Sequence, residues 1–173
     1  MAEFKPLQSP MVEHDFGVGK VQIVGAEDVT ARLTAALGFA PPTAANRISR
    51  NADMGCASVA PHEWLLVGDA AAVGDATDRI EAAFRDDALA LVLNVSQGST
   101  AWRLSAAPAI DRLAAYCPID LTADAFPTGS AARTRFGDIG IFLTRIDDRP
   151  SFWLVADQSY ATYVTHLLDH GVT

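Results

Sequence analysis

Two groups of residues have types and spacing that could support chemistry. His62 and Glu63 are adjacent, and an imidazole beside a carboxylate can pass a proton in general acid–base catalysis. His166 and His170 are four positions apart, a spacing that can hold Zn²⁺ on a helix when a third ligand exists. Each group also has a structural explanation, because neighbours in a strand point to opposite faces and histidines are favourable near a helix C-terminus.

Other possible sites lack the context that their chemistry needs. The segment Gly17-Val18-Gly19-Lys20 is the nearest match to a phosphate-binding loop, but it precedes an expected strand where that motif follows a strand and opens a helix. We interpret it as a turn into the first strand. Ser96, Ser99 and Ser105 lie outside any GxSxG nucleophile elbow. We therefore expect no catalytic, cofactor-binding or metal-binding residues in this chain.

A set of arginines is the best candidate for a contact surface. Arg133 and Arg135 alternate with Thr134 on an expected strand and so share one face, and we expect Arg103 to add to that face. One interpretation is a solvated strand face paired with acidic residues; the other is a contact with a neighbouring subunit, where arginine is enriched. The candidate interface residues are Arg103, Phe126, Arg133 and Arg135.

The tryptophans have two interpretations as well. Trp64, Trp102 and Trp153 each stand in an expected strand, where an indole contributes a large buried area. They could also stack on a flavin or pterin ring, but core packing is the more common role.

Hydrophobic periodicity predicts one supersecondary unit that occurs twice. Each copy reads as strand, helix, three short strands and a second helix. The first copy comprises strands at 21–24, 45–50, 55–59 and 64–67 with helices near 29–37 and 77–84, and the second comprises strands at 102–104, 131–136, 139–146 and 152–156 with helices near 110–117 and 160–168. Residues 89–94 form a further buried strand that joins the halves.

This order predicts an α+β fold of two βαβββα-like subdomains related by a pseudo-twofold axis, with mixed or antiparallel sheets. We expect residues 1–20 to form an extended N-terminal arm and residues 21–173 to form a single domain of two repeats, about 21–88 and 89–173. A chain of 173 residues suits one domain, which buries roughly 70% of the surface of the unfolded chain.

Charge and cysteine content exclude several classes of function. The net charge of −8 repels phosphate backbones and anionic lipid surfaces, so we expect neither nucleic acid nor membrane as a partner. Cys56 and Cys117 lack CxxC or Cys/His spacing and are typical of reduced thiols in a cytoplasmic protein. The N-terminus has acidic residues and prolines where a signal peptide needs an apolar run.

The second half carries a set of recognisable motifs. They are Cys117-Pro118-Ile119-Asp120-Leu121, Ala125-Phe126-Pro127-Thr128-Gly129, Arg133-Thr134-Arg135 and Asp157-Gln158-Ser159-Tyr160-Ala161. With these motifs the chain resembles the gamma subunit of heterotetrameric sarcosine oxidase from about Pro61 onward. It departs from the family at Asn94, where relatives often have aspartate, and at Ile119, where leucine is usual.

The resemblance implies a fold like the folate-binding domain of aminomethyltransferases and a non-catalytic assembly role. It implies a complex with alpha, beta and delta subunits that oxidatively demethylates sarcosine to glycine, with FAD, FMN, NAD and tetrahydrofolate on the partner subunits. The alternative is a freestanding module that binds folate or another one-carbon carrier. A pterin ring commonly pairs with a carboxylate, and Glu63 or Asp120 would have to supply it in place of Asn94.

Overall fold

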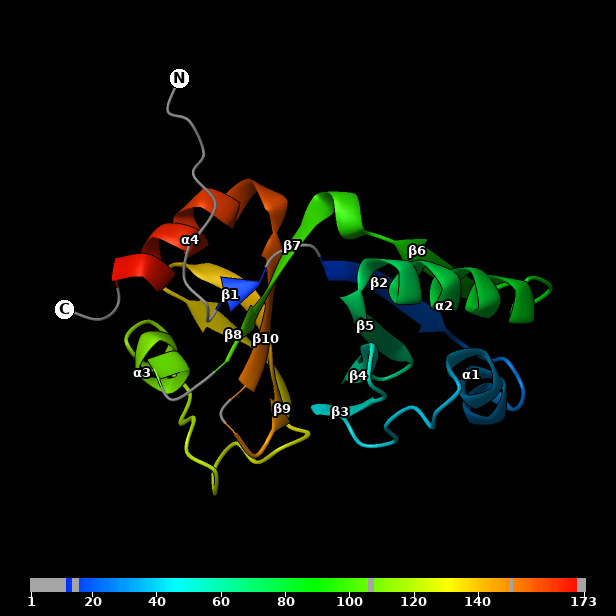
Figure 1. Cartoon of the computed structure of the whole chain (residues 1–173). Helices are drawn as coiled ribbons and strands as arrows, with labels where there is room; N and C mark the ends of the chain where they lie inside the picture. The colour runs from blue at the N-terminus through cyan, green and yellow to red at the C-terminus, as the bar shows by residue number, and fades with distance from the viewer. Residues whose placement is uncertain (1–11, 14–15, 106–107, 150, 171–173) are drawn as a thin grey trace.

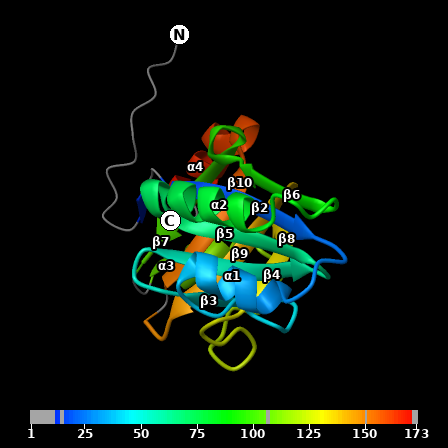
Figure 2. The ribbon, with the colours of Figure 1, turned by 90° about the vertical axis from the view of Figure 1, so that its right-hand side faces the viewer.

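Two antiparallel sheets face each other, and a pair of helices covers the outer face of each. The computed structural model describes residues 12–13, 16–105, 108–149 and 151–170. In Figure 1 the half with α3 and α4 lies on the left and the half with α1 and α2 on the right. Figure 2 shows α1 and α2 in front of the first sheet. The α+β class and the two-sheet arrangement confirm the fold that the periodicity predicts.

The first sheet has strand order β3-β4-β5-β2-β6. Its elements are β2 (Phe16–Ile23), α1 (Val29–Leu37), β3 (Arg47–Arg50), β4 (Met54–Ala60), β5 (Glu63–Asp69), α2 (Ala70–Ala83) and β6 (Ala90–Asn94). Gly38 ends α1 in the left-handed conformation, with φ of 80°. Asp69 caps α2 by accepting from the backbone N–H groups of Ala71 and Ala72.

The second sheet has strand order β1-β7-β10-β9-β8. Its elements are β1 (Val12–Glu13), β7 (Ser99–Leu104), α3 (Pro108–Ala114), β8 (Ala131–Phe136), β9 (Ile139–Asp147), β10 (Ser151–Asp157) and α4 (Ala161–His170). Short 3₁₀ turns η1 (Ser96–Gly98) and η2 (Gln158–Tyr160) precede β7 and α4.

The two halves exchange their first strands. β1 precedes β2 in the chain but pairs with β7 of the second sheet, and β6 precedes β7 but pairs with β2 of the first sheet. Each half then has the same order, in which β1 corresponds to β6 and β2 to β7. The repeat boundary that we propose near residue 89 falls between α2 and β6, although β6 lies in the sheet of the first half.

The structure differs from the sequence-based expectations at several element ends. β2 begins at Phe16, so residues 16–20 are strand rather than part of an arm; residues 1–11 and 14–15 of the expected arm lie outside the described residues. α2 begins at Ala70 rather than near Thr77, because the Asp69 cap starts a helix whose first turn is alanine-rich and lacks apolar periodicity. β6 is an edge strand with exposed leucines, not a buried one.

Hydrophobic contact and backbone hydrogen bonds join the two sheets. Apolar side chains from both sheets form a shared core: Val18, Ile48, Ala57, Leu65, Val67, Ala101, Ala131, Phe142, Ile146, Trp153 and Val155. At one end Ile48 donates its backbone N–H to Gly129 O at 3.0 Å, and Ala131 donates to Asn46 O at 2.9 Å. At the other end the chain passes from β6 to β7, and Val95 at the start of this connection donates to Val18 O of β2 at 2.8 Å. The sheets are therefore joined by hydrogen bonds at one end and by the β6–β7 connection at the other, with space between them.

The helices are short. None of the helices in the described ranges is long and apolar enough to cross a membrane.

Candidate functional site: a groove between the two sheets

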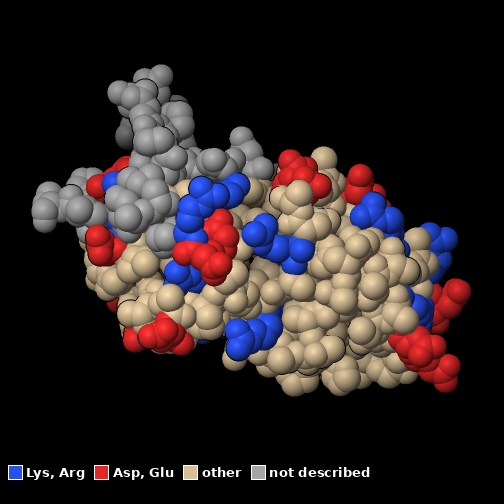
Figure 3. Space-filling view, turned by 60° about the horizontal axis from the view of Figure 1, so that its bottom comes forward, with Lys and Arg blue, Asp and Glu red and all other residues tan. Residues whose placement is uncertain are grey.

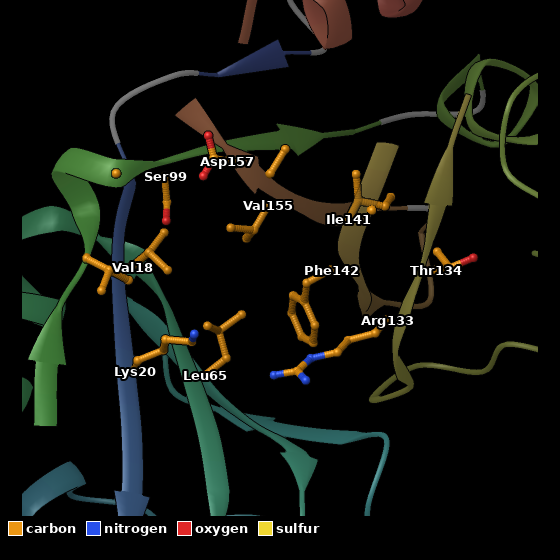
Figure 4. A pocket seen from close by; sticks show the side chains of 14 residues that line it. Val18, Lys20, Leu65, Ser99, Arg133, Thr134, Ile141, Phe142, Val155 and Asp157 are labelled. Atoms are coloured by element: carbon orange, nitrogen blue, oxygen red, sulfur yellow. The ribbon is translucent and has the colours of Figure 1, made fainter. Parts of the chain in front are cut away.

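A groove of about 480 Å³ lies between the sheets, in the space that their two junctions leave. Figure 4 shows its apolar wall, to which Leu65 contributes from β5, Phe142 from β9 and Val155 from β10. Its polar residues include Lys20, Ser99, Arg133 and Asp157. This mixture of an apolar wall and a few polar groups is typical of a binding surface.

Two cations come together in the groove from different sheets. Lys20 extends from β2 and Arg133 from β8, and Figure 4 shows their side chains directed toward each other across the cavity. Arg133 forms an ion pair with Glu63 of β5 at 3.5 Å, with both side chains partly exposed. An exposed pair of this kind contributes little to stability, so its arginine remains available to an additional anion.

A second hollow of about 110 Å³ continues the groove toward the edge of the first sheet. Lys20, Leu65 and Arg133 line both hollows, and Leu91 and Leu93 of β6 extend the second one. Lys20 of β2 is paired across the strands with Leu65 of β5 on one side and with Leu93 of β6 on the other. α2 lies over the opposite face of β6, where Val92 packs against the hydrophobic core between the first sheet and helices α1 and α2, here called the first core. Leu91 and Leu93 are 49% and 43% exposed.

The predicted arginine face exists, but its members are spread along the sheet. The strand register places Arg103, Arg133 and Arg135 on the face of the second sheet that turns toward the first sheet. Arg103 lies on β7, with β10 and β9 between it and β8. Arg135 lies beside Asp138 at 3.8 Å. Of the three, Arg133 lines the groove.

Phe126 is a correction to the predicted interface. Its side chain is buried in the core between the second sheet and its helices, so it cannot present a surface to a partner. Phe126 and Leu121 from the same segment pack together in this core. Sequence reasoning missed Lys20, Leu91 and Leu93 as site residues. The alternation of leucines at 89, 91 and 93 was the available signal for an apolar face.

The His62–Glu63 pair and the glycine-rich segment at Gly17 have structural roles in the fold. His62 lies in the turn before β5 with φ of 63°, and Glu63 pairs with Arg133 rather than with a histidine. Gly17 lies inside β2, where a Cβ atom would come within 2.9 Å of Ala70 Cα in α2. The absence of a side chain at Gly17 thus lets α2 pack on β2. The segment formed by residues 17–20 is part of a strand, and so it is neither a phosphate-binding loop nor the turn that we expected.

No group of three or more His, Cys, Asp or Glu residues that could hold a metal ion occurs within the described ranges. His166 lies on α4, and nothing is described of the His170 side chain. Burial raises the pKa of the Cys56 thiol to about 12, so this cysteine stays protonated and unreactive at neutral pH. Cys117 is also a buried free thiol.

Trp102 and Trp153 are buried, as core packing predicts, and Trp64 is half-buried against the first core.

The motif residues of the second half form turns and caps. Asp120 accepts from the backbone N–H of Thr122 at 2.9 Å, and this bond lowers the pKa of its carboxyl group. Asp157 accepts from the hydroxyl and the backbone N–H of Ser159 at 2.6 and 2.9 Å, which lowers its pKa in the same way. Both carboxylates shape the chain at the start of a segment.

Arg145 holds the motif segment against the second sheet. Only 4% of it is exposed, and its Nη1 donates to Phe126 O at 3.2 Å and to Leu121 O at 3.4 Å. Its guanidinium also lies 5.8 Å from the centre of the Phe152 ring. Gly129, with φ of 82°, donates its backbone N–H to Arg145 O at 3.0 Å and accepts from Ile48 of the first sheet. The motif therefore positions one junction between the sheets.

The side-chain oxygen of Asn94 accepts hydrogen bonds in a local turn, as an aspartate carboxylate at this position could. Its Oδ1 accepts from Ser96 N at 3.1 Å and from Ser96 Oγ at 2.7 Å. Ser96 Oγ in turn accepts from Val18 N at 2.9 Å. The amide oxygen is thus engaged in the turn that carries the chain from β6 to β7.

These arrangements favour binding over catalysis. The described carboxylates Asp120, Asp157 and Glu63 and the amide of Asn94 each have a partner within the chain, and they do not converge on one point. The groove offers two cations beside apolar side chains, and Asp157 and Glu63, which also line it, already have partners. It can hold an anionic group flanked by apolar ones.

Solved structures with this arrangement define the class of protein. A chain of the heterotetrameric sarcosine oxidase from Corynebacterium sp. U-96, in complex with pyrrole 2-carboxylate, matches with a TM-score of 0.79 and 21% identity over 92% of this chain and 82% of that one. The glycine cleavage system aminomethyltransferase T from Bartonella henselae matches with a TM-score of 0.64 and 14% identity, over 92% of this chain and 45% of that one. The protein has the duplicated α+β fold shared by these proteins.

The family follows from the sequence itself. The model of the sarcosine oxidase gamma subunit family matches residues 25–172, and the chain belongs to that family. This confirms the resemblance carried by the motifs. No curated protein matches the sequence at a significant level.

Proposed function

We propose that this chain is the gamma subunit of a sarcosine oxidase-like heterotetramer and that it serves assembly rather than chemistry. The observation that carries the proposal is the structural use of the motif segments: the motif residues Asp120 and Asp157 form caps, and Arg145 of β9 clamps the motif segment that contains Phe126. A subunit whose characteristic polar groups fix its own backbone is suited to present a rigid surface to its partners.

The proposal includes the composition of the complex. The partners are alpha, beta and delta subunits, which carry FAD, FMN, NAD and tetrahydrofolate and together demethylate sarcosine to glycine. The complex works in the cytoplasm and does not use nucleic acid or membrane as a partner. Arg133 and Arg135, which are exposed, and the half-buried Arg103 are proposed subunit contacts.

The surface supports this role. Figure 3 shows basic side chains near the middle of the molecule, where the halves meet, and a broad uncharged area over the half that carries α1 and β3. For a chain with a net charge of −8, an uncharged area of this kind fits coverage by a partner.

Purification of the chain alone tests the catalytic part of the proposal. We expect a colourless protein that releases no hydrogen peroxide from sarcosine. Flavin absorbance in the purified chain, or turnover of sarcosine by it, would contradict the assignment.

The inter-sheet groove favours one alternative, a module that binds a folate. Calorimetry with tetrahydrofolate distinguishes the two functions. We expect no heat of binding at micromolar concentrations, since Asn94, Glu63 and Asp120 are engaged elsewhere. Micromolar binding by the isolated chain would favour the module.

A further inference from the structure

The groove that runs from the inter-sheet space to β6 ends beside two exposed leucines. Leu91 and Leu93 project from the same face of an edge strand, and they are among the few large apolar side chains that are exposed in the described ranges. Exposed apolar side chains that adjoin one another mark interaction sites more often than isolated ones do.

The charges of the groove indicate what kind of group it accepts. Lys20 stands between Leu65 and Leu93 in register, and Arg133 approaches from the other sheet. The acidic side chain that pairs with these cations in the described structure is Glu63, at 3.5 Å from Arg133. In a chain with surplus acid, two cations directed into an apolar hollow are complementary to a carboxylate.

We infer that this groove, formed by Lys20, Leu65, Leu91, Leu93 and Arg133, receives a segment of a partner oxidase subunit that carries an acidic side chain between apolar ones. The inference rests on the proposed function, because it assigns one surface to the assembly role. The acidic side chain lies between Lys20 and Arg133, and its apolar neighbours cover Leu91 and Leu93. Arginine at the centre of such a contact and apolar groups around it are the usual composition of an interface core.

The first test uses matched variants of the chain co-expressed with the larger subunits of its oxidase. Leu93→Asp and Arg133→Glu alter the groove, whereas Leu89→Asp and Arg85→Glu make the same changes at exposed positions that line neither hollow. Leu89 is 65% exposed, more than Leu93, so its replacement is a strict control. We expect the groove variants to weaken association at least tenfold and the control variants to leave it within twofold. Thermal unfolding of each isolated variant must show that it folds.

The second test identifies the chemistry of the occupant. A carbodiimide activates a carboxylate as an O-acylisourea; a lysine amine in contact with it attacks the acyl carbon and forms an amide, and the carbodiimide leaves as its urea. In the wild-type complex we expect a cross-link between Lys20 and an acidic residue of a partner subunit, found by peptide mass spectrometry. Lys20→Gln removes the reacting amine and should abolish this cross-link.

The outcomes separate the inference from the proposed function. Failure of the wild-type chain to associate with the larger subunits would overturn both. Normal assembly of Leu93→Asp and Arg133→Glu, or a Lys20 that forms no cross-link to a partner, would overturn the inference and leave the function intact. Self-association of the isolated chain through the groove, shown by sedimentation and abolished by Leu93→Asp, would also overturn it.

Discussion

At the scale of single residues, buried polar groups in this protein serve backbone geometry. Arg145 lies almost wholly inside the second half, where carbonyl oxygens of the motif segment accept its N–H groups. A buried cation is costly unless its donors are satisfied, and here the satisfied donors fix a segment that has few regular hydrogen bonds.

Replacing Arg145 tests this clamp. Arg145→Met leaves the carbonyls of Leu121 and Phe126 without their donor, and we expect it to lower the free energy of unfolding by about 1–3 kcal/mol. Urea denaturation of the isolated chain measures the change. Arg135→Met, at an exposed position, is the control and should stay within about 0.5 kcal/mol. Equal losses in both variants would show that Arg145 has no special role.

Asp157 gives a pH-dependent prediction. The hydroxyl of Ser159 and then its backbone N–H lower the pKa of this carboxyl group. A lowered pKa in the folded state means that the unfolded chain binds more protons between the two values, so stability rises with pH there. The contribution is complete above the unfolded pKa of about 3.9 and disappears as pH falls through the lower folded value.

NMR titration of the Asp157 carboxyl carbon measures this effect. Ser159→Ala removes the hydroxyl hydrogen bond, which is the larger of the two causes of the lowered pKa. In this variant the pKa of Asp157 should move up toward its ordinary value. Thr128→Ala, which removes a hydroxyl that bonds Asp148 instead, should leave the pKa of Asp157 where it was. An unchanged pKa in Ser159→Ala would refute the cap.

At the scale of elements, close helix-to-strand packing depends on small residues. Gly17 and Gly19 of β2 lie under α2, and a Cβ atom at either position would meet the helix or Leu66 at short range. α2 in turn covers the inner strands of the first sheet. The position of β2, and therefore of Lys20 in the groove, depends on this contact.

Adding a single methyl group at Gly17 tests the packing of α2 on β2. Gly17→Ala places a Cβ atom 2.9 Å from both Ala70 Cα and Val73 Cβ, and overpacking of this kind typically costs about 1–3 kcal/mol. Gly140→Ala is a matched control in β9, where nothing lies within 4 Å of the added atom. We expect a lower midpoint of thermal unfolding in the first variant only. Equal midpoints would mean that α2 moves aside freely.

Much of this element pattern could be predicted from the sequence. Apolar periodicity and turn residues located the strands of both repeats, and Gly38 marked the end of α1. The exchange of β1 and β6 could not be predicted, because local patterns define a strand but not the sheet that it joins. Alternation along a strand does predict that Arg133 and Arg135 share one face. That Lys20 and Leu93 are neighbours of Arg133 depends on how the two sheets pack, which local patterns do not define.

At the scale of the whole molecule, the fold consists of two linked halves. The exchanged strands, the shared core and the hydrogen bonds at Gly129 link each sheet to the other. A body of this kind keeps a groove between its halves in one shape, which lowers the cost of ordering that surface when a partner binds.

The most direct test of the proposed assembly role is native mass spectrometry of the chain co-expressed with the larger oxidase subunits. The account predicts one complex that contains a single copy of this chain together with flavin-bearing subunits, and a loss of intact complex when the chain is omitted. A chain that stays monomeric in every sample, while the larger subunits assemble and oxidise sarcosine without it, would contradict the account.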